Sequence, residues 1–264
     1  MIIDGRKLAA EIGQELATDF SKLSPVILAV IMVGENKATY SFVAQKERFA
    51  AKIGVEVRLF EYDKKVTKSE LLKVVDRLAQ DKKITGIIIQ LPLPSHIDQE
   101  LITNAVPASK DVDALGNEPV VDSPVAAAVL EILARYHIKL AGQKAVVVGQ
   151  GKLVGQPVSL ALARAGALVV TTDIKTKNLI EELSTADIVV SGTGMPGLIK
   201  PEMIKGGVVI IDAGTSEVGQ VVQGDALPAC ANKAALFTPV PGGVGPITVA
   251  MLFKNLLQLA NRVV

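Results

Sequence analysis

Tryptophan is absent from this 264-residue sequence, and aromatic residues make up only 3% of it. Proteins that stack exposed bases on aromatic side chains need more of them, so single-stranded nucleic acid is not expected as a partner. The charges also nearly cancel, because 28 Lys and Arg residues face 27 Asp and Glu residues. A net charge of +1 therefore predicts no nucleic acid and no anionic membrane surface among the partners.

Cysteine and histidine are scarce as well. The single cysteine, Cys230, excludes an internal disulfide and a multi-cysteine metal site. The only histidines are His96 and His137, which lie 41 positions apart. No metal site is therefore predicted.

Long hydrophobic runs are missing too. The longest wholly apolar run, residues 26–33, has eight residues, whereas a membrane-spanning helix needs about 18. The N-terminal segment lacks the positive-then-apolar order of a signal peptide, since it carries both Asp4 and Glu11. We expect a cytoplasmic protein with no membrane segment.

Aliphatic residues are abundant, and their spacing predicts alternating strands and helices. Strands are expected at 26–33, 55–62, 86–90, 144–149, 167–172, 187–192 and 208–214, and helices at 38–53, 67–78, 124–136, 153–165 and 247–259. Thr67 and Glu70 have the spacing of a capping box at a helix start. Alternation of this kind is typical of an α/β fold with parallel sheets. The two halves of the chain predict two such layers, with a boundary near residue 120.

A glycine-rich turn follows the apolar run at 144–149. Gly149, Gly151 and Gly155 lie between a predicted strand and a predicted helix. Glycines allow the backbone to turn tightly and to approach a pyrophosphate, while the helix N-terminus supplies free N–H groups and positive dipole. The pattern predicts a dinucleotide site, and a tight turn without a ligand is the alternative.

Two residues near this turn bear on the choice of nucleotide. Asp173 directly follows the next predicted strand, 24 residues after Gly149, close to where an acid bonds the ribose hydroxyls. Its charge repels a 2′-phosphate, and Gln150 offers no positive charge to attract one. We therefore predict NAD over NADP, although Lys175 and Lys177 leave NADP open and Asp173 is alternatively a solvated loop residue.

Residues of the 38–53 helix point to a second site. Thr39, Phe42 and Lys46 share one helix face. A lysine beside apolar side chains is partly desolvated, which lowers its pKa and suits it to acid–base or electrostatic work. Gln90 ends a predicted strand, where ligands bind in open α/β sheets, and its amide can accept from a lysine. The alternatives are that Lys46 extends into water and that Gln90 caps a loop.

Two loops complete the candidate residues. Asp111 and Asp113 lie in the segment 110–115, where one carboxylate can pair with a cationic heterocycle while Asp111 alternatively bonds its own turn. Near the C-terminus, prolines bracket Gly242 and Gly243. Such a turn lets the backbone approach a flat ligand closely.

Taken in chain order, these segments resemble the methylenetetrahydrofolate dehydrogenase/cyclohydrolase family of one-carbon metabolism. The matching motifs are VGENKATYSFVAQK, GIIIQLPLP, KDVDAL, VVGQGKLVGQPV, TKNL, VVIIDAG, the pair at 224–225, and TPVPGGVGPITVA. The resemblance implies an N-terminal α/β catalytic domain, residues 1–120 and 246–264, and a Rossmann-type dinucleotide-binding domain with a parallel sheet, residues 121–245. It also implies a homodimer with a folate substrate held in the cleft between the domains.

The family oxidises 5,10-methylene- to 5,10-methenyltetrahydrofolate with NAD or NADP, then hydrolyses the product to 10-formyltetrahydrofolate. By resemblance, Lys46 is the central lysine, Gln90 its hydrogen-bonding partner and Asp113 the acid that binds the pterin-like ring. The resemblance further implies two sets of binding residues: Thr39, Phe42, Pro241, Gly242 and Gly243 for folate, and Gly149, Gln150, Gly151, Gly155 and Asp173 for the dinucleotide.

The sequence also departs from the family pattern. Phe42 replaces the usual tyrosine four residues before the lysine, so a phenol that helps to position the lysine is lost. Ala114 replaces a usual glycine, and Gln150 with Gly151 replaces an Arg–Ser pair that commonly holds the 2′-phosphate of NADP. The segment 121–130 replaces a usual Cys/Thr-Pro segment.

These departures leave alternatives to a bifunctional enzyme. Loss of the phenol at Phe42 is compatible with a dehydrogenase that lacks efficient cyclohydrolase activity. Changes in both halves are compatible with a non-catalytic, folate-binding dimer. An unrelated Rossmann dehydrogenase would leave the motifs at 90–94 and 241–246 unexplained.

Overall fold

The structure is a computed structural model that describes all residues except 24, 35–36, 220 and 263–264; residues 35–36 of the VGENKATYSFVAQK motif therefore lie outside the described residues. The chain divides into two compact units. One, here called the five-strand unit, comprises Met1–Ala9 and Val125–Thr248; the other, the three-strand unit, comprises Ala10–Pro124 and Val249–Val264.

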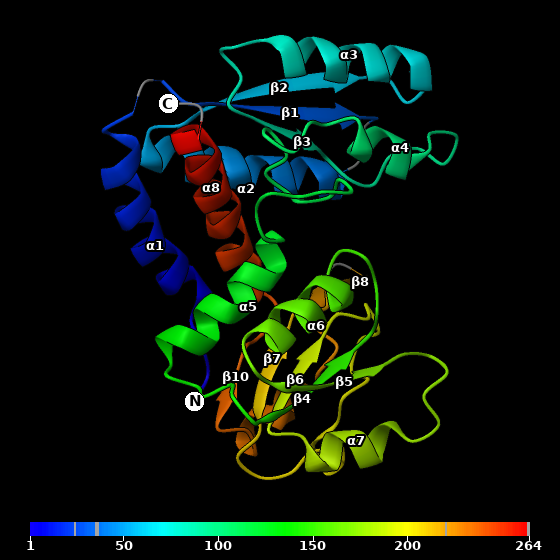
Figure 1. Cartoon of the computed structure of the whole chain (residues 1–264). Coiled ribbons are helices and arrows are strands. Elements are labelled where there is room, and N and C mark those ends of the chain that lie inside the picture. Colours follow the sequence, from blue (N-terminus) through cyan, green and yellow to red (C-terminus); the bar gives the residue numbers. More distant parts are fainter. Residues whose placement is uncertain (24, 35–36, 220, 263–264) are drawn as a thin grey trace. The chain divides into compact units, whose positions relative to one another are not determined.

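The three-strand unit is built on a parallel sheet in the order β2-β1-β3. Its strands are β1 (Ile27–Val33), β2 (Glu56–Tyr62) and β3 (Gly86–Ile89), and its helices include α2 (Lys37–Ile53), α3 (Lys68–Gln80) and α4 (Gln99–Asn104). Figure 1 shows α3 and α2 on opposite faces of the sheet. All seven residues of β1 are buried, as expected for a central strand covered on both faces. The predicted β-α-β-α-β unit is confirmed.

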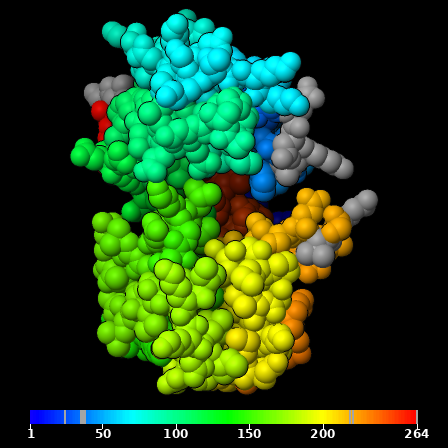
Figure 2. All heavy atoms as spheres, turned by 90° about the vertical axis from the view of Figure 1, so that its right-hand side faces the viewer, coloured from blue at the N-terminus to red at the C-terminus, as the bar shows by residue number. Residues whose placement is uncertain are grey.

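Helix α3 was predicted from local sequence signals, whereas the short helix α4 was not predicted. The amide of Glu70 donates to the Thr67 hydroxyl over 3.2 Å, and the Thr67 amide donates to the Glu70 carboxylate over 2.8 Å, which completes the predicted capping box. Helix α3 lies on the surface of its unit, shown in cyan in Figure 2. Helix α4 has six residues, too few for a helical repeat to be visible in the sequence.

The core of this unit joins one side of β1 to α3 and β3. It contains Ile27, Ala29, Ile31, Val33, Leu71, Val75, Leu78, Ile87 and Ile89. The other side receives α8 (Val244–Arg262), whose Phe253 stacks on Phe49 of α2 with ring centroids 5.3 Å apart. A side chain at Gly86 would overlap Leu256 of α8, so β3 and α8 pack closely.

The five-strand unit has a second parallel sheet, in the order β10-β7-β6-β4-β5. The strands are β4 (Lys144–Val148), β5 (Leu168–Thr172), β6 (Ile188–Ser191), β7 (Val209–Asp212) and β10 (Leu236–Phe237). The helices are α5 (Pro124–Arg135), α6 (Gly155–Arg164) and α7 (Leu179–Thr185), with α6 and α7 on opposite faces of the sheet in Figure 1. Short elements absent from the prediction include β10, the antiparallel pair β8 (Ser216–Val218) and β9 (Val221–Gln223), and two 3-10 helices, Pro201–Met203 and Pro228–Asn232.

The N-terminal residues join this second sheet. Ile2 forms a parallel bridge with Phe237 of β10, and the amide of Ile3 donates to the Phe237 carbonyl over 2.9 Å. Helix α1 (Gly5–Phe20) follows directly. The sequence prediction assigned all of 1–120 to one domain, whereas the compact units place Met1–Ala9 with residues 125–248. A pairing so distant in sequence leaves no local pattern.

Two helix starts differ from the prediction. Helix α8 begins at Val244 rather than at residue 247, because Pro246 fits the first turn of a helix, where its missing N–H has no intrahelical partner. Helix α6 begins at Gly155 rather than at Leu153. Among the described residues, no helix has the length and apolar character that crossing a membrane requires.

Candidate functional site

Lys46 and Gln90 meet in the three-strand unit. The Lys46 Nζ donates to Gln90 Oε1 over 2.7 Å. Gln90 follows β3 at the carboxyl end of the sheet, is 7% exposed, and donates from Nε2 to the Leu91 carbonyl over 3.0 Å. The sequence left two roles open for this amide, capping the loop and accepting from the lysine. In the structure it makes both hydrogen bonds.

Lys46 is half-buried, and two features of its surroundings act on its pKa in opposite directions. Burial lowers the pKa of the Lys46 ammonium, and the nearby negative charge of Asp113 partly offsets this effect. Desolvation disfavours a charged amine, so the lysine loses its proton more easily than one in water. A lysine whose pKa is lowered in this way is better suited to give up and take back a proton than an exposed one.

Asp111 shapes the loop that carries Asp113. Its buried carboxylate accepts the Asp113 amide over 3.2 Å at Oδ1 and the Gly116 amide over 2.8 Å at Oδ2. Ala114 between them has φ +55°, which explains why glycine suits this position. Asp111 thus bonds its own turn, and the carboxylate of Asp113 is left to interact with Lys46.

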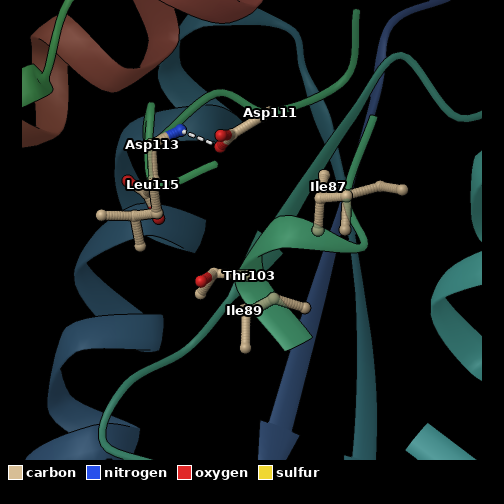
Figure 3. A pocket seen from close by; sticks show the side chains of 7 residues that line it. Ile87, Ile89, Thr103, Asp111, Asp113 and Leu115 are labelled. Carbon is tan, nitrogen blue, oxygen red and sulfur yellow. Dashed lines mark hydrogen bonds between the residues drawn. The ribbon is translucent and has the colours of Figure 1, made fainter. Parts of the chain in front are cut away.

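Burial, first of all, raises the pKa of Asp113 to about 6; the Lys46 charge lowers it and the Asp111 charge raises it further. Beside both acids lies a small cavity of about 10 Å³, shown in Figure 3. Its lining residues are Ile87, Ile89, Thr103, Val106, Asp111, Asp113 and Leu115. A space of this size is about what one water molecule needs.

Phe42 lies about one turn before Lys46 on α2, and Thr39 lies about two turns before it. Thr39 is 4% exposed, whereas the ring of Phe42 is 50% exposed. A large aromatic ring left this open has surface free to stack on a flat ligand. The predicted helix face is thus present, with a buried hydroxyl residue and an exposed ring.

The three glycines of the turn after β4 lie in different local environments. Gly149 has φ +91°, and a Cβ at Gly155 would overlap the Gly149 carbonyl oxygen, so the backbone itself requires both glycines. A Cβ at Gly151 would meet no atom within 4 Å. Gly151 is exposed, so the space beside it is open, and its role in binding a dinucleotide stays a prediction.

Gln150 lies within this turn, and Asp173 follows β5, the strand that pairs with β4. The Gln150 Nε2 donates to the Gly149 carbonyl over 2.8 Å, so the side chain folds back on its own turn. Asp173 follows β5, is exposed, and accepts the Lys175 amide over 2.8 Å at Oδ1. Asp173 therefore carries a negative charge at the carboxyl edge of the sheet while also bonding its own loop.

The loop Pro241–Gly243 belongs to the five-strand unit. Gly242 has φ +101°, and its carbonyl accepts the Gly5 amide over 2.9 Å. A Cβ at Gly243 would lie 2.5 Å from the Pro239 carbonyl oxygen. Backbone packing accounts for both glycines, while Pro241 is exposed.

Two buried acids are further candidates for a functional role, and the sequence analysis did not propose either of them as a site residue. Asp212, at the end of β7, and Asp225 are both buried. Burial chiefly raises the pKa of Asp212 to about 6, with a further rise from the charge of Asp225. The sequence signals were two motifs of the family resemblance: VVIIDAG, which contains Asp212, and the pair Gly224–Asp225. Within the described part of the chain, no group of three or more His, Cys, Asp or Glu side chains could hold a metal ion.

A parallel sheet with a glycine turn at its carboxyl edge, together with a separate α/β unit carrying a partly desolvated lysine, defines the class of two-domain dinucleotide-binding enzymes. Comparison with family models agrees. Residues 3–113 match the tetrahydrofolate dehydrogenase/cyclohydrolase catalytic domain, and residues 123–264 match its NAD(P)-binding domain. The chain belongs to the tetrahydrofolate dehydrogenase/cyclohydrolase family.

Individual relatives cover the whole chain. The bifunctional protein FolD of Halothermothrix orenii is 39% identical over 275 residues, which span 97% of this chain and 96% of that protein. FolD of Moorella thermoacetica is also 39% identical, with 99% of both chains covered. The crystal structure of the bifunctional FolD dehydrogenase/cyclohydrolase from Campylobacter jejuni has a TM-score of 0.97 at 33% identity, covering 100% of this chain and 99% of that one. The predicted family and α/β fold are confirmed.

The glycine turn can be tested by stability alone. We expect Gly155→Ala to lower the free energy of unfolding by about 1–3 kcal/mol, because the added methyl group overlaps backbone. Gly151→Ala is the matched control and should change it by less than about 0.5 kcal/mol. Urea denaturation measures both, and equal losses would contradict the view that the space at Gly151 is open.

Proposed function

We propose that this protein oxidises 5,10-methylenetetrahydrofolate to the methenyl form by hydride transfer to a nicotinamide cofactor, and then hydrolyses that product to 10-formyltetrahydrofolate. The observation that carries the proposal is the 2.7 Å hydrogen bond between Lys46 and Gln90, beside Asp113. Membership of the dehydrogenase/cyclohydrolase family supports it.

The first step leaves a cation shared by two folate nitrogens. When bound, the nicotinamide supplies the hydride acceptor, so the protein orients the folate and controls nearby charge. A fully charged lysine would oppose the new cation. Burial lowers the pKa of Lys46, which weakens this opposition, and Gln90 holds the Nζ in place.

The second step needs a proton acceptor, and Lys46 is our candidate. In its neutral form the amine can take a proton from the water as the water oxygen bonds to the methenyl carbon. The bond between that carbon and one ring nitrogen then breaks, the nitrogen receives one proton, and the remaining proton of the water is released to solvent as the formyl C=O forms. Gln90 accepts from Nζ and so fixes the direction of the amine. In this proposal Lys46 and Gln90 act together in both reactions.

The remaining residues bind the two ligands. We assign Asp113 to the pterin ring, where its carboxylate accepts N–H donors. Thr39, Phe42, Pro241, Gly242 and Gly243 contact folate in this proposal. Gly149, Gln150, Gly151, Gly155 and Asp173 bind the dinucleotide. We retain the assignment of 1–120 with 246–264 to folate and of 121–245 to the dinucleotide as part of the proposal.

Removing the lysine should stop the chemistry without unfolding the protein. We expect Lys46→Ala to lower both turnover numbers by about 10²–10⁴-fold, the usual contribution of a positioned acid or base. Nicotinamide reduction and decay of methenyltetrahydrofolate are followed by absorbance. Lys52→Ala, an exposed change on the same helix, is the control. Undiminished rates in Lys46→Ala would reject the proposed role, and buffer-level hydrolysis by the native chain would reject the second activity.

Asp113 should set the acid side of the pH profile. Its pKa is raised to about 6, so the carboxyl is neutral below that pH and cannot accept from the pterin or attract the Lys46 ammonium. We expect kcat/KM for the folate to fall as pH falls through about 6. In Asp113→Asn, kcat/KM should be low throughout and this acidic fall should disappear. A fall with the same midpoint in Asp113→Asn would show that another group titrates.

For the nucleotide we propose NAD over NADP, since Asp173 repels a 2′-phosphate and Gln150 cannot bind one. The double change Gln150→Arg, Asp173→Ser should shift the kcat/KM ratio towards NADP by roughly ten- to a hundredfold, the effect of one charge-assisted contact. Asp173→Glu keeps the charge and serves as the control. A native kcat/KM higher for NADP would contradict this preference.

We also propose a cytoplasmic homodimer. Strand β5 stands last in its sheet, and Leu168 at its start is 63% exposed. An edge strand with apolar surface is a place where a second copy can pair. Light scattering would give twice the chain mass of 27.7 kDa for a dimer, and a monomer mass would reject it. Cell fractionation tests the compartment.

A further inference from the structure

The carboxyl edge of the five-strand sheet contains a pair of buried acids outside the proposed binding residues. Asp212 and Asp225 are each 1% exposed. Burying a carboxylate is costly unless hydrogen bonds compensate for the lost water. The bonds of these side chains therefore indicate what they hold in place.

Asp225 gathers one short segment. Its Oδ2 accepts the Ser191 hydroxyl and the Thr193 amide, both over 2.6 Å, and its Oδ1 accepts the Met195 amide over 2.9 Å. All three donors belong to residues 191–195, at and after the end of β6. Bonds from N–H and O–H groups to a buried carboxylate are short and strong, so this segment is held at three points.

The held segment packs on the glycine turn. The Gly192 amide donates to the Val148 carbonyl over 3.0 Å. A Cβ at Gly149 would lie 3.0 Å from both the Gly192 carbonyl oxygen and Thr193 Cγ2, and a Cβ at Gly192 would overlap Val154. Residues 192 and 193 thus contact both ends of the turn between β4 and α6.

Asp212 and two glycines keep Asp225 in position. A Cβ at Gly214 would overlap the Asp225 carboxylate, and a Cβ at Gly224 would overlap the Asp212 carboxylate. Asp212 accepts the amides of Gly214 and Ala226 over 3.0 and 2.8 Å. The Asp225 carboxylate therefore occupies the space that a side chain at Gly214 would need, and the Asp212 carboxylate occupies the space that a side chain at Gly224 would need.

We propose that Asp225 is a positioning residue for dinucleotide binding: it holds residues 191–195 against the glycine turn and so fixes the turn's shape. The buried carboxylate supports the turn from behind and does not touch the ligand. This inference rests on the proposed function, because it assumes that the turn binds NAD or NADP.

The change Asp225→Asn keeps the size of the side chain and replaces one acceptor oxygen with a donor. Whichever way the amide is turned, its NH₂ group faces one backbone N–H, that of Met195 or that of Thr193. We expect the dissociation constant for NADH, measured by its fluorescence, to rise roughly ten- to a hundredfold, the effect of losing a bond to a charged group. Hydrolysis of methenyltetrahydrofolate should keep its native rate, since it needs no dinucleotide and Lys46 lies in the other unit.

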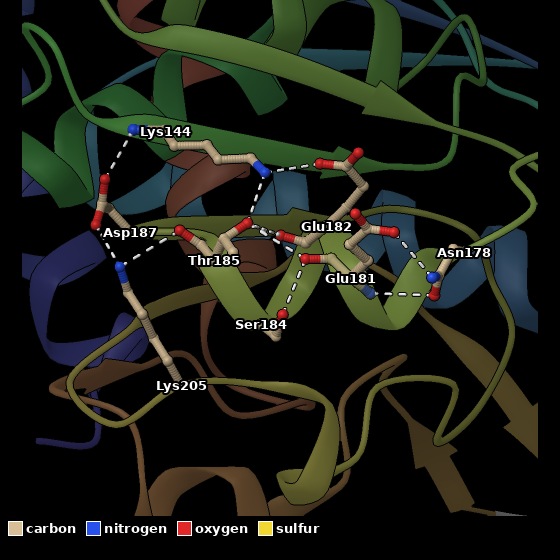
Figure 4. Close-up of polar contacts among 8 residues, drawn as sticks. All are labelled: Lys144, Asn178, Glu181, Glu182, Ser184, Thr185, Asp187 and Lys205. Atoms are coloured by element: carbon tan, nitrogen blue, oxygen red, sulfur yellow. Dashed lines mark hydrogen bonds and ion pairs between the residues drawn. The ribbon is translucent and has the colours of Figure 1, made fainter.

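Asp187→Asn is the matched control, at the amino edge of the same sheet. Asp187 accepts the Lys144 amide over 2.8 Å and the Lys205 ammonium over 2.5 Å, as Figure 4 shows. Its loss should lower Tm yet leave the NADH dissociation constant unchanged. Ser191→Ala removes a single donor to Asp225 and is the milder variant should Asp225→Asn not fold; it should weaken NADH binding by a smaller factor.

The outcomes distinguish a failure of the positioning role of Asp225 from a failure of the proposed function. Native NADH affinity in folded Asp225→Asn, or in Ser191→Ala where the first variant does not fold, overturns the positioning role. Equal weakening in Asp187→Asn also overturns it, because the effect would then be general destabilisation. Failure of the native chain to bind NADH or NADPH overturns the proposed function, and the inference with it.

Discussion

The bond between Lys46 and Gln90 depends on the parallel order of the three-strand sheet. Gln90 stands at the carboxyl end of β3, which pairs directly with the central strand β1. Helix α2 leaves β1 at that same edge and brings Lys46 back over it. Any shift of β3 by one residue would turn Gln90 to the other face of the sheet. The lysine would then be a partly buried ammonium without its acceptor, which is unfavourable.

Both units use a buried acid in the same way. Asp111 accepts the amides of Asp113 and Gly116, and Asp225 accepts those of Thr193 and Met195. In each case the oxygens of one carboxylate are occupied by a loop. The loop then presents other groups, the Asp113 carboxylate in one unit and the support of the glycine turn in the other. Ligand-binding groups gain precision when neighbouring hydrogen bonds restrict their movement.

Local chemistry carried most of what the sequence could predict. The capping box of Thr67, the strand at 144–149 and the glycine turn each depend on neighbours within a few residues, and the structure contains all three. The contact of Lys46 with Gln90 spans 44 positions, and the resemblance to a family supplied that pairing. Asp225 escaped because its three donors lie 30 or more positions away. The short helix α4 and the N-terminal bridge to β10 escaped for the same lack of a local repeat.

Helix α8 has a consequence for the order of assembly. Its residues from Val249 onward belong to the three-strand unit, where the buried Asn255 donates to the carbonyls of Val112 and Asp122 over 2.9 and 2.8 Å. The five-strand unit, by contrast, has all its residues by Thr248. During synthesis, the unit whose strands leave the ribosome first is therefore the last to be finished. The loop that carries Asp113 can therefore form its hydrogen bond from Asn255 to the Val112 carbonyl only after the last turns of α8 have been synthesised.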